Sequence, residues 1–152
     1  MAEYLNNDIQ LVAAGAPVLL RTSIGCSRGF VYHRPESGIL ILRGIVNNPC
    51  ANFARYQVTF NGNIAVPEDG TAGPIAVALA VDGEPIATSR AIVTPTAVDA
   101  YFNVTSTAMI DVPRGCCFNL SVENVSESAD PATTPAPSIN VQNSNLVVSR
   151  IA

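Results

Sequence analysis

Residues 54–83, ARYQVTFNGNIAVPEDGTAGPIAVALAVDG, decide which fold this chain can adopt. In the first part of the stretch, Tyr56, Val58 and Phe60 fall on one side of an extended chain, and the polar residues between them fall on the other. A period of two is typical of a β-strand with one buried face and one solvated face. Residues 67–74 are rich in Pro, Gly and Asp, which favour turns. The sequence therefore predicts two strands joined by a loop.

The second strand of this pair, residues 75–81, has an unusual composition on one face. One row is large and apolar, whereas the opposite row consists of Ala76, Ala78 and Ala80, where a solvated strand would carry polar side chains. Methyl groups on this side indicate that something covers them closely. We predict that the cover is another copy of the chain, so these three alanines are a candidate oligomer interface. The alternative, which stays open at this point, is a second sheet or a loop of the same subunit.

Length and composition indicate one all-β domain over residues 1–152. A chain of this length buries roughly 68–70% of its unfolded surface, which is enough for a self-sufficient core. Aromatic residues make up only 6% of the chain and there is no Trp. Ten Gly and eleven Pro are spread along it, as turns between short strands require. No segment of about ten or more residues shows the spacing of an amphipathic helix.

Short apolar or alternating runs bounded by turn residues predict about ten strands. The expected strands are at 9–13, 18–21, 30–33, 39–46, 54–66, 75–81, 86–93, 98–112, 118–123, 139–141 and 146–151. The run 39–46 is expected to be a central strand buried on both faces, and the uneven pattern at 106–109 is expected to be a bulge. Asp82-Gly83 predicts a tight hairpin turn, 143–145 a further turn, and the Pro-rich stretch 127–138 an exposed surface loop. The simplest architecture is an antiparallel two-sheet jelly-roll sandwich.

Along the run 98–112, Phe102, Val104, Ile110 and Val112 are expected to point into the core.

Charged residues are sparse, at 13% of the chain, and the net charge is −4. All eight basic residues are Arg. Nucleic-acid binding needs a concentrated basic surface, so this class of function is excluded. A subunit with so few charges and a positive mean hydropathy is expected to oligomerise, because assembly removes apolar surface from water.

The start of the chain, MAEYLNND, is polar and lacks a basic region before an apolar run, so we expect no signal peptide. No stretch reaches the roughly 18 apolar residues of a membrane span. We therefore expect synthesis in a cytoplasm, where thiols stay reduced. The four cysteines are expected to be small buried apolar residues, and their spacing fits no zinc site: Cys26, Cys50, Cys116 and Cys117.

No pattern of residues that carries catalysis is complete. A nucleophile needs a base beside it and a third group to hold that base. His33 is the only histidine and lies next to Arg34-Pro35 at a strand end, where we expect a half-exposed or hydrogen-bonded side chain. No activating partner lies near Cys116 or Cys117 in the sequence. We expect no catalytic residue, no cofactor and no enzymatic activity.

Carboxylates at 68–69 and 82–84 fall in turns, and their spacing matches no dedicated calcium site, so we expect no bound metal. Asn103, Asn119 and Asn124 each begin a glycosylation acceptor pattern. Without a secretory signal we attribute these patterns to chance.

The succession of short strands ending in an apolar C-terminal strand resembles the compact jelly rolls of the tumour-necrosis-factor and complement-head superfamily. The resemblance lies in the strand pattern and covers most of the chain, without a diagnostic motif. It implies a jelly roll that assembles as a homotrimer.

A second set of segments is spread over nearly the whole chain. It comprises MAEYLNN at 1–7, His33-Arg34, Ser37-Gly38, Leu42-Arg43-Gly44, FNGNIAVP at 60–67, DGE at 82–84, VTP at 93–95, DVPRGCC at 111–117 and NVQN at 140–143. Together they resemble small proteins encoded near the head genes of tailed phages and prophages of Clostridia-like gut bacteria. The loop at 127–138 is longer than this group leads one to expect. The resemblance implies a virion structural role, as a capsid decoration or head-fibre component, and no catalytic residues.

Three functions are compatible with the sequence. The first is a homotrimeric phage structural protein, located in the virion and bound to the major capsid protein or another virion component. The alternative is a jelly-roll module that binds a glycan or receptor at a virion or cell surface through the loops 68–74 and 127–138, although the absence of Trp removes the usual aromatic platform. The third, an enzyme of the double-stranded β-helix type, needs two or three converging metal ligands, and one histidine makes it the weakest.

Overall fold

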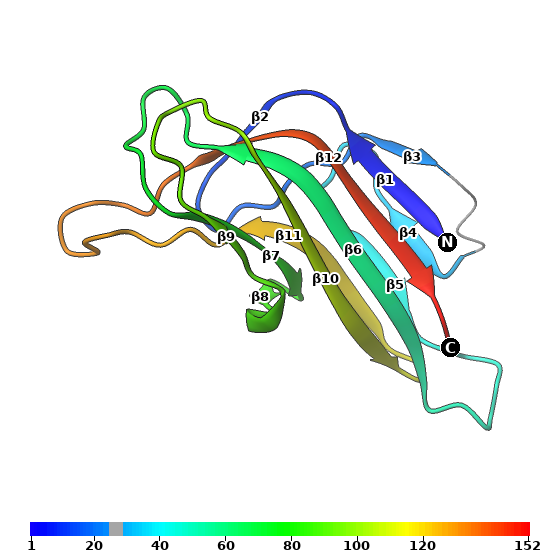
Figure 1. The fold of residues 1–152 in the computed structure, drawn as a ribbon. Helices are drawn as coiled ribbons and strands as arrows, with labels where there is room; N and C mark the ends of the chain where they lie inside the picture. Colours follow the sequence, from blue (N-terminus) through cyan, green and yellow to red (C-terminus); the bar gives the residue numbers. More distant parts are fainter. Residues whose placement is uncertain (25–28) are drawn as a thin grey trace.

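A computed structural model, which describes residues 1–24 and 29–152, shows two six-stranded antiparallel sheets packed face to face (Figure 1). Sheet A runs in the order β10 (Phe102–Pro113), β6 (Phe53–Ala65), β12 (Ile139–Arg150), β1 (Ala2–Asn6) and β3 (Thr22–Ile24), and β2 (Gln10–Val12) also pairs with β12. Sheet B runs in the order β4 (Val31–His33), β5 (Leu40–Arg43), β11 (Cys117–Asn124), β7 (Ile75–Val81) and β8 (Glu84–Pro85), and β9 (Ala91–Val93) also pairs with β7. The predicted all-β, antiparallel two-sheet jelly roll is confirmed, and the described residues form twelve strands where about ten were expected.

One short 3-10 turn, η1 (Ala87–Ser89), is the only helix among the described residues. In this part of the chain no helix has the length and apolar character needed to cross a membrane.

Strand β6 holds the core together. As predicted, Tyr56, Val58 and Phe60 alternate inward and are 0% exposed. The strand is 13 residues long and pairs with β10 on one side and with β12 on the other. Leucines from sheet B, such as Leu79 and Leu120, pack against this row from the opposite sheet and are also 0% exposed. The expected inward row of β10 is confirmed for three of its four residues, because Phe102 at the start of the strand is 44% exposed.

The Tyr56 hydroxyl links the two sheets. It lies 2.5 Å from the carbonyl oxygen of Arg43 and 3.1 Å from that of Phe30, and it donates its hydrogen to these acceptors. Burial raises the pKa of the Tyr56 phenol above its ordinary value, because the charged form would lose its hydration. These hydrogen bonds join the start of β6 to the last residue of β5 and to the residue before β4.

The bulge lies in a different strand from the one the sequence predicts. Strand β10 pairs with β6 in an unbroken register, from Phe102 opposite Ile64 to Pro113 opposite Phe53, so the bulge predicted at 106–109 is wrong. The register shift occurs in β12, between Gln142 and Asn145. The predicted turn at 143–145 is therefore a bulge within a continuous strand. Its Asn143 has φ 49°, a left-handed conformation that Asn tolerates better than most residues.

The apolar run 39–46 does not form a central strand buried on both faces. Only Leu40–Arg43 pairs as β5, with Leu40 and Leu42 fully buried, whereas Ile39 and Val46 are 47% and 69% exposed. The chain leaves the sheet at Gly44, whose backbone N–H donates to the carbonyl of Cys116 at 2.9 Å. The apolar sequence therefore continues beyond the part of the run that is buried.

Two further segments differ from the expected strands. The predicted strand 86–93 is interrupted by η1, where the Ser89 hydroxyl accepts the Leu79 N–H at 3.0 Å and thus replaces a strand partner. The polar start of the chain, in contrast, forms β1, in which Ala2, Tyr4 and Asn6 are at most 4% exposed.

The Asp82-Gly83 hairpin is confirmed, because both residues have positive φ, as a type I′ turn requires.

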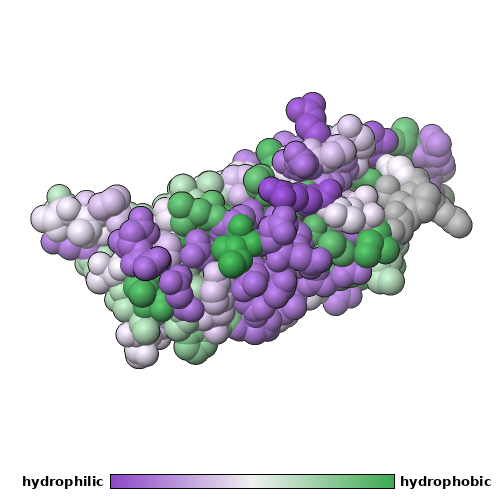
Figure 2. All heavy atoms as spheres, turned by 90° about the horizontal axis from the view of Figure 1, so that it is seen from above, coloured by the Kyte–Doolittle hydropathy of each residue, from purple (hydrophilic) through white to green (hydrophobic). Residues whose placement is uncertain are grey.

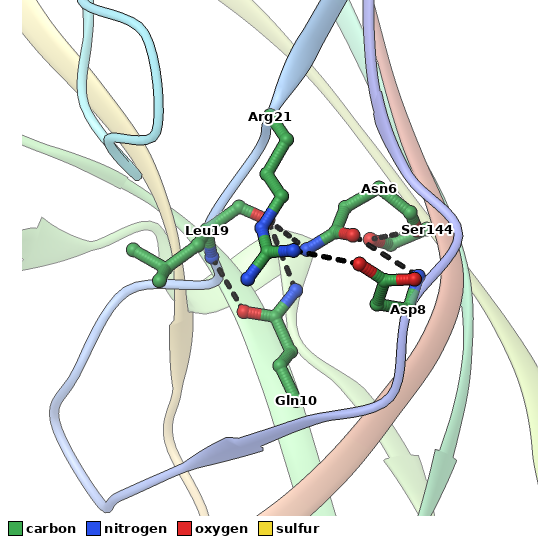
Figure 3. Close-up of polar contacts among 6 residues, drawn as sticks. All are labelled: Asn6, Asp8, Gln10, Leu19, Arg21 and Ser144. Atoms are coloured by element: carbon green, nitrogen blue, oxygen red, sulfur yellow. Dashed lines mark hydrogen bonds and ion pairs between the residues drawn. The ribbon is translucent and has the colours of Figure 1, made fainter.

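The predicted strand 18–21 belongs to neither sheet but crosses between them along one side. Val18 and Leu20 alternate inward and are at most 1% exposed, so the sequence pattern reports burial correctly. Its backbone bonds to strands of both sheets, because the Val18 N–H donates to the Val122 carbonyl at 2.7 Å and the Arg21 N–H donates to the Leu5 carbonyl at 3.0 Å. Between these bonds, the Gln10 amide accepts the Leu19 N–H at 2.8 Å and donates to the Leu19 carbonyl at 2.9 Å (Figure 3). Asn6 donates to the same carbonyl at 3.2 Å. These amides therefore bond the backbone groups of Leu19, which have no backbone partner among the described strands.

Candidate functional site

The outer side of sheet A carries an array of mostly uncharged polar side chains, which we call the neutral face. Since side chains alternate along a strand, the residues between the core residues of the three longest strands point outward. The neutral face consists of Arg55, Gln57, Thr59, Asn61 and Asn63 of β6, Asn103, Thr105, Thr107, Met109 and Asp111 of β10, and Asn145, Val147 and Ser149 of β12.

Polar groups on the neutral face bond to one another across the strands. The Thr105 hydroxyl donates to the Asn61 side-chain oxygen at 3.1 Å, and the Asn103 amide donates to the Asn63 oxygen at 3.2 Å. One pair further along, the hydroxyls of two threonines lie 3.2 Å apart: Thr59 and Thr107. Groups that already have a partner lose less when water is removed from the surface.

The two charged residues of the neutral face, Arg55 and Asp111, form an ion pair with each other. Arg55 Nε and Nη2 donate to the two carboxylate oxygens of Asp111, each at 2.7 Å. The hydrogen bonds from Arg55 lower the pKa of the Asp111 carboxyl, and those to Asp111 raise the pKa of Arg55. The neighbouring Glu3 of β1 accepts the Asn145 amide at 2.9 Å.

Low charge is what distinguishes the buried centre of protein–protein interfaces from ordinary surface. The neutral face is therefore suited to contact with another protein surface. The low charge of this face is visible in the sequence, because the outward positions of 55–63 carry a single charge. Alternation alone, however, predicts that these residues are solvated and does not identify an interface.

The alanine row on the outer side of β7 is covered by its own subunit. Ala76, Ala78 and Ala80 are 2%, 1% and 0% exposed in the isolated subunit. These methyl groups leave no accessible area for a neighbouring copy, so they do not provide the interface that the sequence predicts. The alternative interpretation, a cover from the same subunit, replaces it.

Arg90 supplies part of this cover. Extending the pairing of β9 with β7 by one residue places Arg90 opposite Ala78, on the outer side. From there its guanidinium donates to the Val125 carbonyl at 3.0 Å and to Glu127 at 2.9 Å, both beyond the far edge of β7. The side chain therefore crosses β7, and only small residues fit beneath it. The Arg90 side chain thus accounts for the small residues of β7 that lie beneath it.

Replacing Ala78 with Leu is expected to lower the free energy of unfolding by about 1–3 kcal/mol, because the added carbons have no space under the Arg90 side chain. Denaturant unfolding at a fixed protein concentration measures this change. The exposed Ala129→Leu is the matched control and should stay within about 0.5 kcal/mol of the wild type. Unchanged stability together with an altered oligomeric state in Ala78→Leu would instead restore the interface role of the row.

The other candidate residues from the sequence do not come together in a catalytic or metal site among the described residues. His33, at the end of β4, is half-buried, and its Nε2 lies 2.9 Å from the Ser37 carbonyl oxygen, to which it donates. Its ring packs on Tyr4, with the ring centres 5.0 Å apart. A ring nitrogen that donates to a carbonyl is not placed to activate a nucleophile. Over residues 1–24 and 29–152, no group of three or more His, Cys, Asp or Glu residues is arranged to hold a metal ion.

Three of the cysteines differ from the prediction of buried thiols. Cys50, Cys116 and Cys117 are free and exposed, because they lie in the loop after β5 and at the turn between β10 and β11. Cys26 lies outside the described residues.

The acceptor pattern at Asn124 has a structural explanation. Its side chain is 1% exposed, donates to the carbonyls of Val12 and Pro137 at 3.0 and 2.9 Å, and accepts the Ser126 N–H at 3.0 Å. Asn124 therefore fixes β2 and the loop 127–138 to the end of β11. Asn103 and Asn119 are exposed.

The two loops proposed for ligand binding lie side by side. A groove of about 480 Å³ is lined by Leu11, by residues 67 and 69–75, and by residues 127–129 and 134–138. Its walls are mostly Pro, Ala, Gly, Thr and Ser, and the lining includes no aromatic side chain. The groove therefore lacks the flat ring on which a sugar commonly packs.

Comparison with known proteins identifies the fold. No protein-family model and no curated protein matches the sequence. Among solved structures, the globular domain of zebrafish complement 1qA protein is similar over 96% of this chain and 94% of its own, at 13% identity and a TM-score of 0.57. The Eiger TNF of S. frugiperda is similar over 100% of this chain and 92% of its own, at 11% identity and a TM-score of 0.60.

A third structure, the sugar-binding C-terminal domain of EclA, matches 82% of this chain and 87% of its own at 15% identity, and its TM-score of 0.37 is too low to indicate a common fold. The first two matches establish a jelly roll like those of C1q and TNF.

Proposed function

We propose that the protein is a structural component of a bacteriophage virion, made in the cytoplasm of the host bacterium, which assembles as a homotrimer and attaches to the capsid as a decoration or head-fibre subunit. The neutral face is the feature that supports the proposed homotrimer. It is a regular surface on three long strands, and its polar groups form hydrogen bonds with one another. Its two charged residues, Arg55 and Asp111, form an ion pair with each other. Burying these bonded, uncharged polar groups against another copy costs less desolvation than burying unpaired or charged ones.

The resemblance to small phage head proteins supports the proposed location of the protein in the virion. The segment FNGNIAVP at 60–67 includes Asn61 and Asn63 of the neutral face, and DVPRGCC at 111–117 begins with Asp111 of its ion pair. The resemblance therefore includes part of the proposed interface. A trimer would also multiply a weak contact with the capsid, because several subunits bind at once.

Asn61→Arg is expected to convert the trimer into monomers, because it places an unpaired charge in the middle of the neutral face. Asn119→Arg makes the same chemical change on the exposed outer side of sheet B and should leave the trimer intact. Size-exclusion chromatography with light scattering gives the mass directly, with about three times the 15.9 kDa of one chain expected for the wild type and the control.

Thr107→Arg, at an exposed position of the same face, gives a second test in case Asn61→Arg fails to fold. A monomeric wild type at micromolar concentration would refute the trimer, and trimers of both neutral-face variants would refute this interface. Mass spectrometry of purified virions tests the location separately, and absence of the protein from the particles would refute the virion role.

The groove between the loops supports a second candidate, a module that binds a glycan or receptor. The specific observation is that both loops singled out in the sequence line one groove. Binding to a glycan array by the wild type, lost when residues 131–135 are shortened, would favour this function over capsid decoration.

A further inference from the structure

The two ends of the sandwich differ in charge. At one end lie the loop 44–52, the turn between β10 and β11, and both chain termini (Figure 1). Backbone bonds hold these parts together: Gly44 donates to Cys116 at 2.9 Å and Arg114 donates to Asn52 at 2.8 Å. We call this the basic end, since its described side chains include four arginines and one carboxylate: Arg43, Arg55, Arg114, Arg150 and Asp111.

Exposed apolar residues accompany these arginines. Phe30 and Phe53 are 42% and 39% exposed, and the guanidinium groups of Arg150 and Arg55 lie over their rings at 4.3 and 5.0 Å. Val46 is 69% exposed at the same end. Arginine and aromatic residues are enriched in protein interfaces and dominate their binding energy. The basic end therefore has the composition of a contact surface.

The opposite end is acidic. It is formed by the loops 66–74, 94–101 and 125–138, of which the first two are joined by a bond from Asp99 N–H to the Val66 carbonyl at 2.8 Å. The first and third loops line the groove described above. The acidic end carries five exposed carboxylates, Glu68, Asp69, Asp99, Glu127 and Asp130, and among its described residues one arginine, Arg90, which pairs with Glu127.

Apolar residues are also exposed near the acidic end, with Leu11 65% and Phe102 44% exposed. Seen from above, the molecule is elongated, and apolar groups are scattered among hydrophilic ones along its length (Figure 2). The opposite charges are thus separated along the long direction of the subunit, and each lies beside apolar surface.

We infer that the basic end of one copy docks onto the acidic end of a second copy, so that subunits, or their trimers, stack in rows. Both surfaces belong to the same chain and are complementary in charge, which favours this encounter and disfavours contact between two like ends. A contact between two different patches of identical subunits does not close on itself and can continue. The stacking goes beyond the proposed function, because it uses the two ends of the sandwich, shares only Arg55 and Asp111 with the neutral face, and does not require a trimer.

Salt provides the first test. Sedimentation velocity of the wild type should show larger species at about 50 mM salt that dissociate at about 500 mM, because exposed charges are screened. Arg114→Glu at the basic end and Glu68→Arg at the acidic end should each weaken this association on the order of tenfold or more. Arg34→Glu and Glu84→Arg make the same charge changes at exposed positions on the flanks and should retain it.

Mixing provides the decisive test. The double variants Arg43→Gln/Arg114→Gln and Glu68→Gln/Asp69→Asn, which remove charge without reversing it, should each fail to stack alone. Together they should form pairs that grow no further, because the intact acidic end of the first meets the intact basic end of the second and both remaining ends are altered.

The exposed thiols at the basic end give an independent readout. Maleimide labelling of Cys116 and Cys117 should be several-fold slower in the stacked wild type than in the basic-end variant. No salt-dependent association of the wild type, or equal weakening in the flank controls, would overturn the inference. The trimer mass measured at high salt is unaffected by that outcome, so failure of the stacking and failure of the proposed trimer are distinguishable.

Discussion

Phe60→Ala is expected to lower the free energy of unfolding by about 3–5 kcal/mol, which is the usual cost of removing a buried aromatic ring. Phe60 is 0% exposed in the middle of β6, opposite Ser106 of β10 and Leu146 of β12. Its ring lies beside Gly62, where an added Cβ would come within 2.9 Å of Phe60 Cζ. The loss of the ring would leave a cavity between the sheets that these paired strands cannot readily close.

The matched control for this change is Gln57→Ala, at an exposed position of the same strand, which should alter stability by no more than about 0.5 kcal/mol. Guanidinium denaturation followed by circular dichroism measures both variants, at one protein concentration because assembly contributes to apparent stability. A loss below about 1 kcal/mol in Phe60→Ala would contradict the central place of this ring in the core.

Gly44→Ala is expected to destabilise the fold by about 1–3 kcal/mol or more, although Gly44 has no unusual backbone conformation. A Cβ at this position would collide with the carbonyl oxygen of Pro113 and lie 3.0 Å from that of Cys116. Both obstacles are backbone atoms of the turn between β10 and β11, so relief of the collision requires a shift of the turn or of the strand end. The bond from Gly44 N–H to the Cys116 carbonyl would be strained at the same time.

Gly73→Ala is the matched control for Gly44→Ala, because its nearest obstacle, the carbonyl oxygen of Thr71, is 4.0 Å away. Thermal and chemical denaturation of the two variants should separate them clearly. Equal stabilities would show that the loop 44–52 does not pack against the turn at 113–117 as described.

The fold class followed from the sequence because alternation is a local property of a strand. The rows Tyr56–Val58–Phe60 and Val104–Ile110–Val112 are buried as predicted, and so are the inward residues of the segment 18–21, although it is not a strand of either sheet. The predictions were wrong where an apolar residue is not paired in a strand, or where the strand partner decides the local structure. Residues 39–46 are apolar throughout, but the chain turns away at Gly44, and the bulge lies in β12 because pairing partners, not composition, decide where a register shifts.

The candidate site was only partly accessible from the sequence. The loops 68–74 and 127–138 were singled out and do line one groove. The alanine row was recognised as covered, but the identity of the cover depends on Arg90 reaching Val125 and Glu127, a contact between residues 35 and 37 positions apart. The neutral face emerged only when β6, β10 and β12 were placed side by side.

The sequence by itself determined that this chain forms short alternating strands, that it packs them as a jelly roll, and that it carries little charge. These properties depend on each residue and its near neighbours, since side-chain period and turn preference are local. The tertiary structure alone decided which alanines are covered, which cysteines are exposed, and that basic and acidic residues collect at opposite ends. Those features depend on pairings between strands far apart in the chain, and a pattern within one strand does not specify its partner.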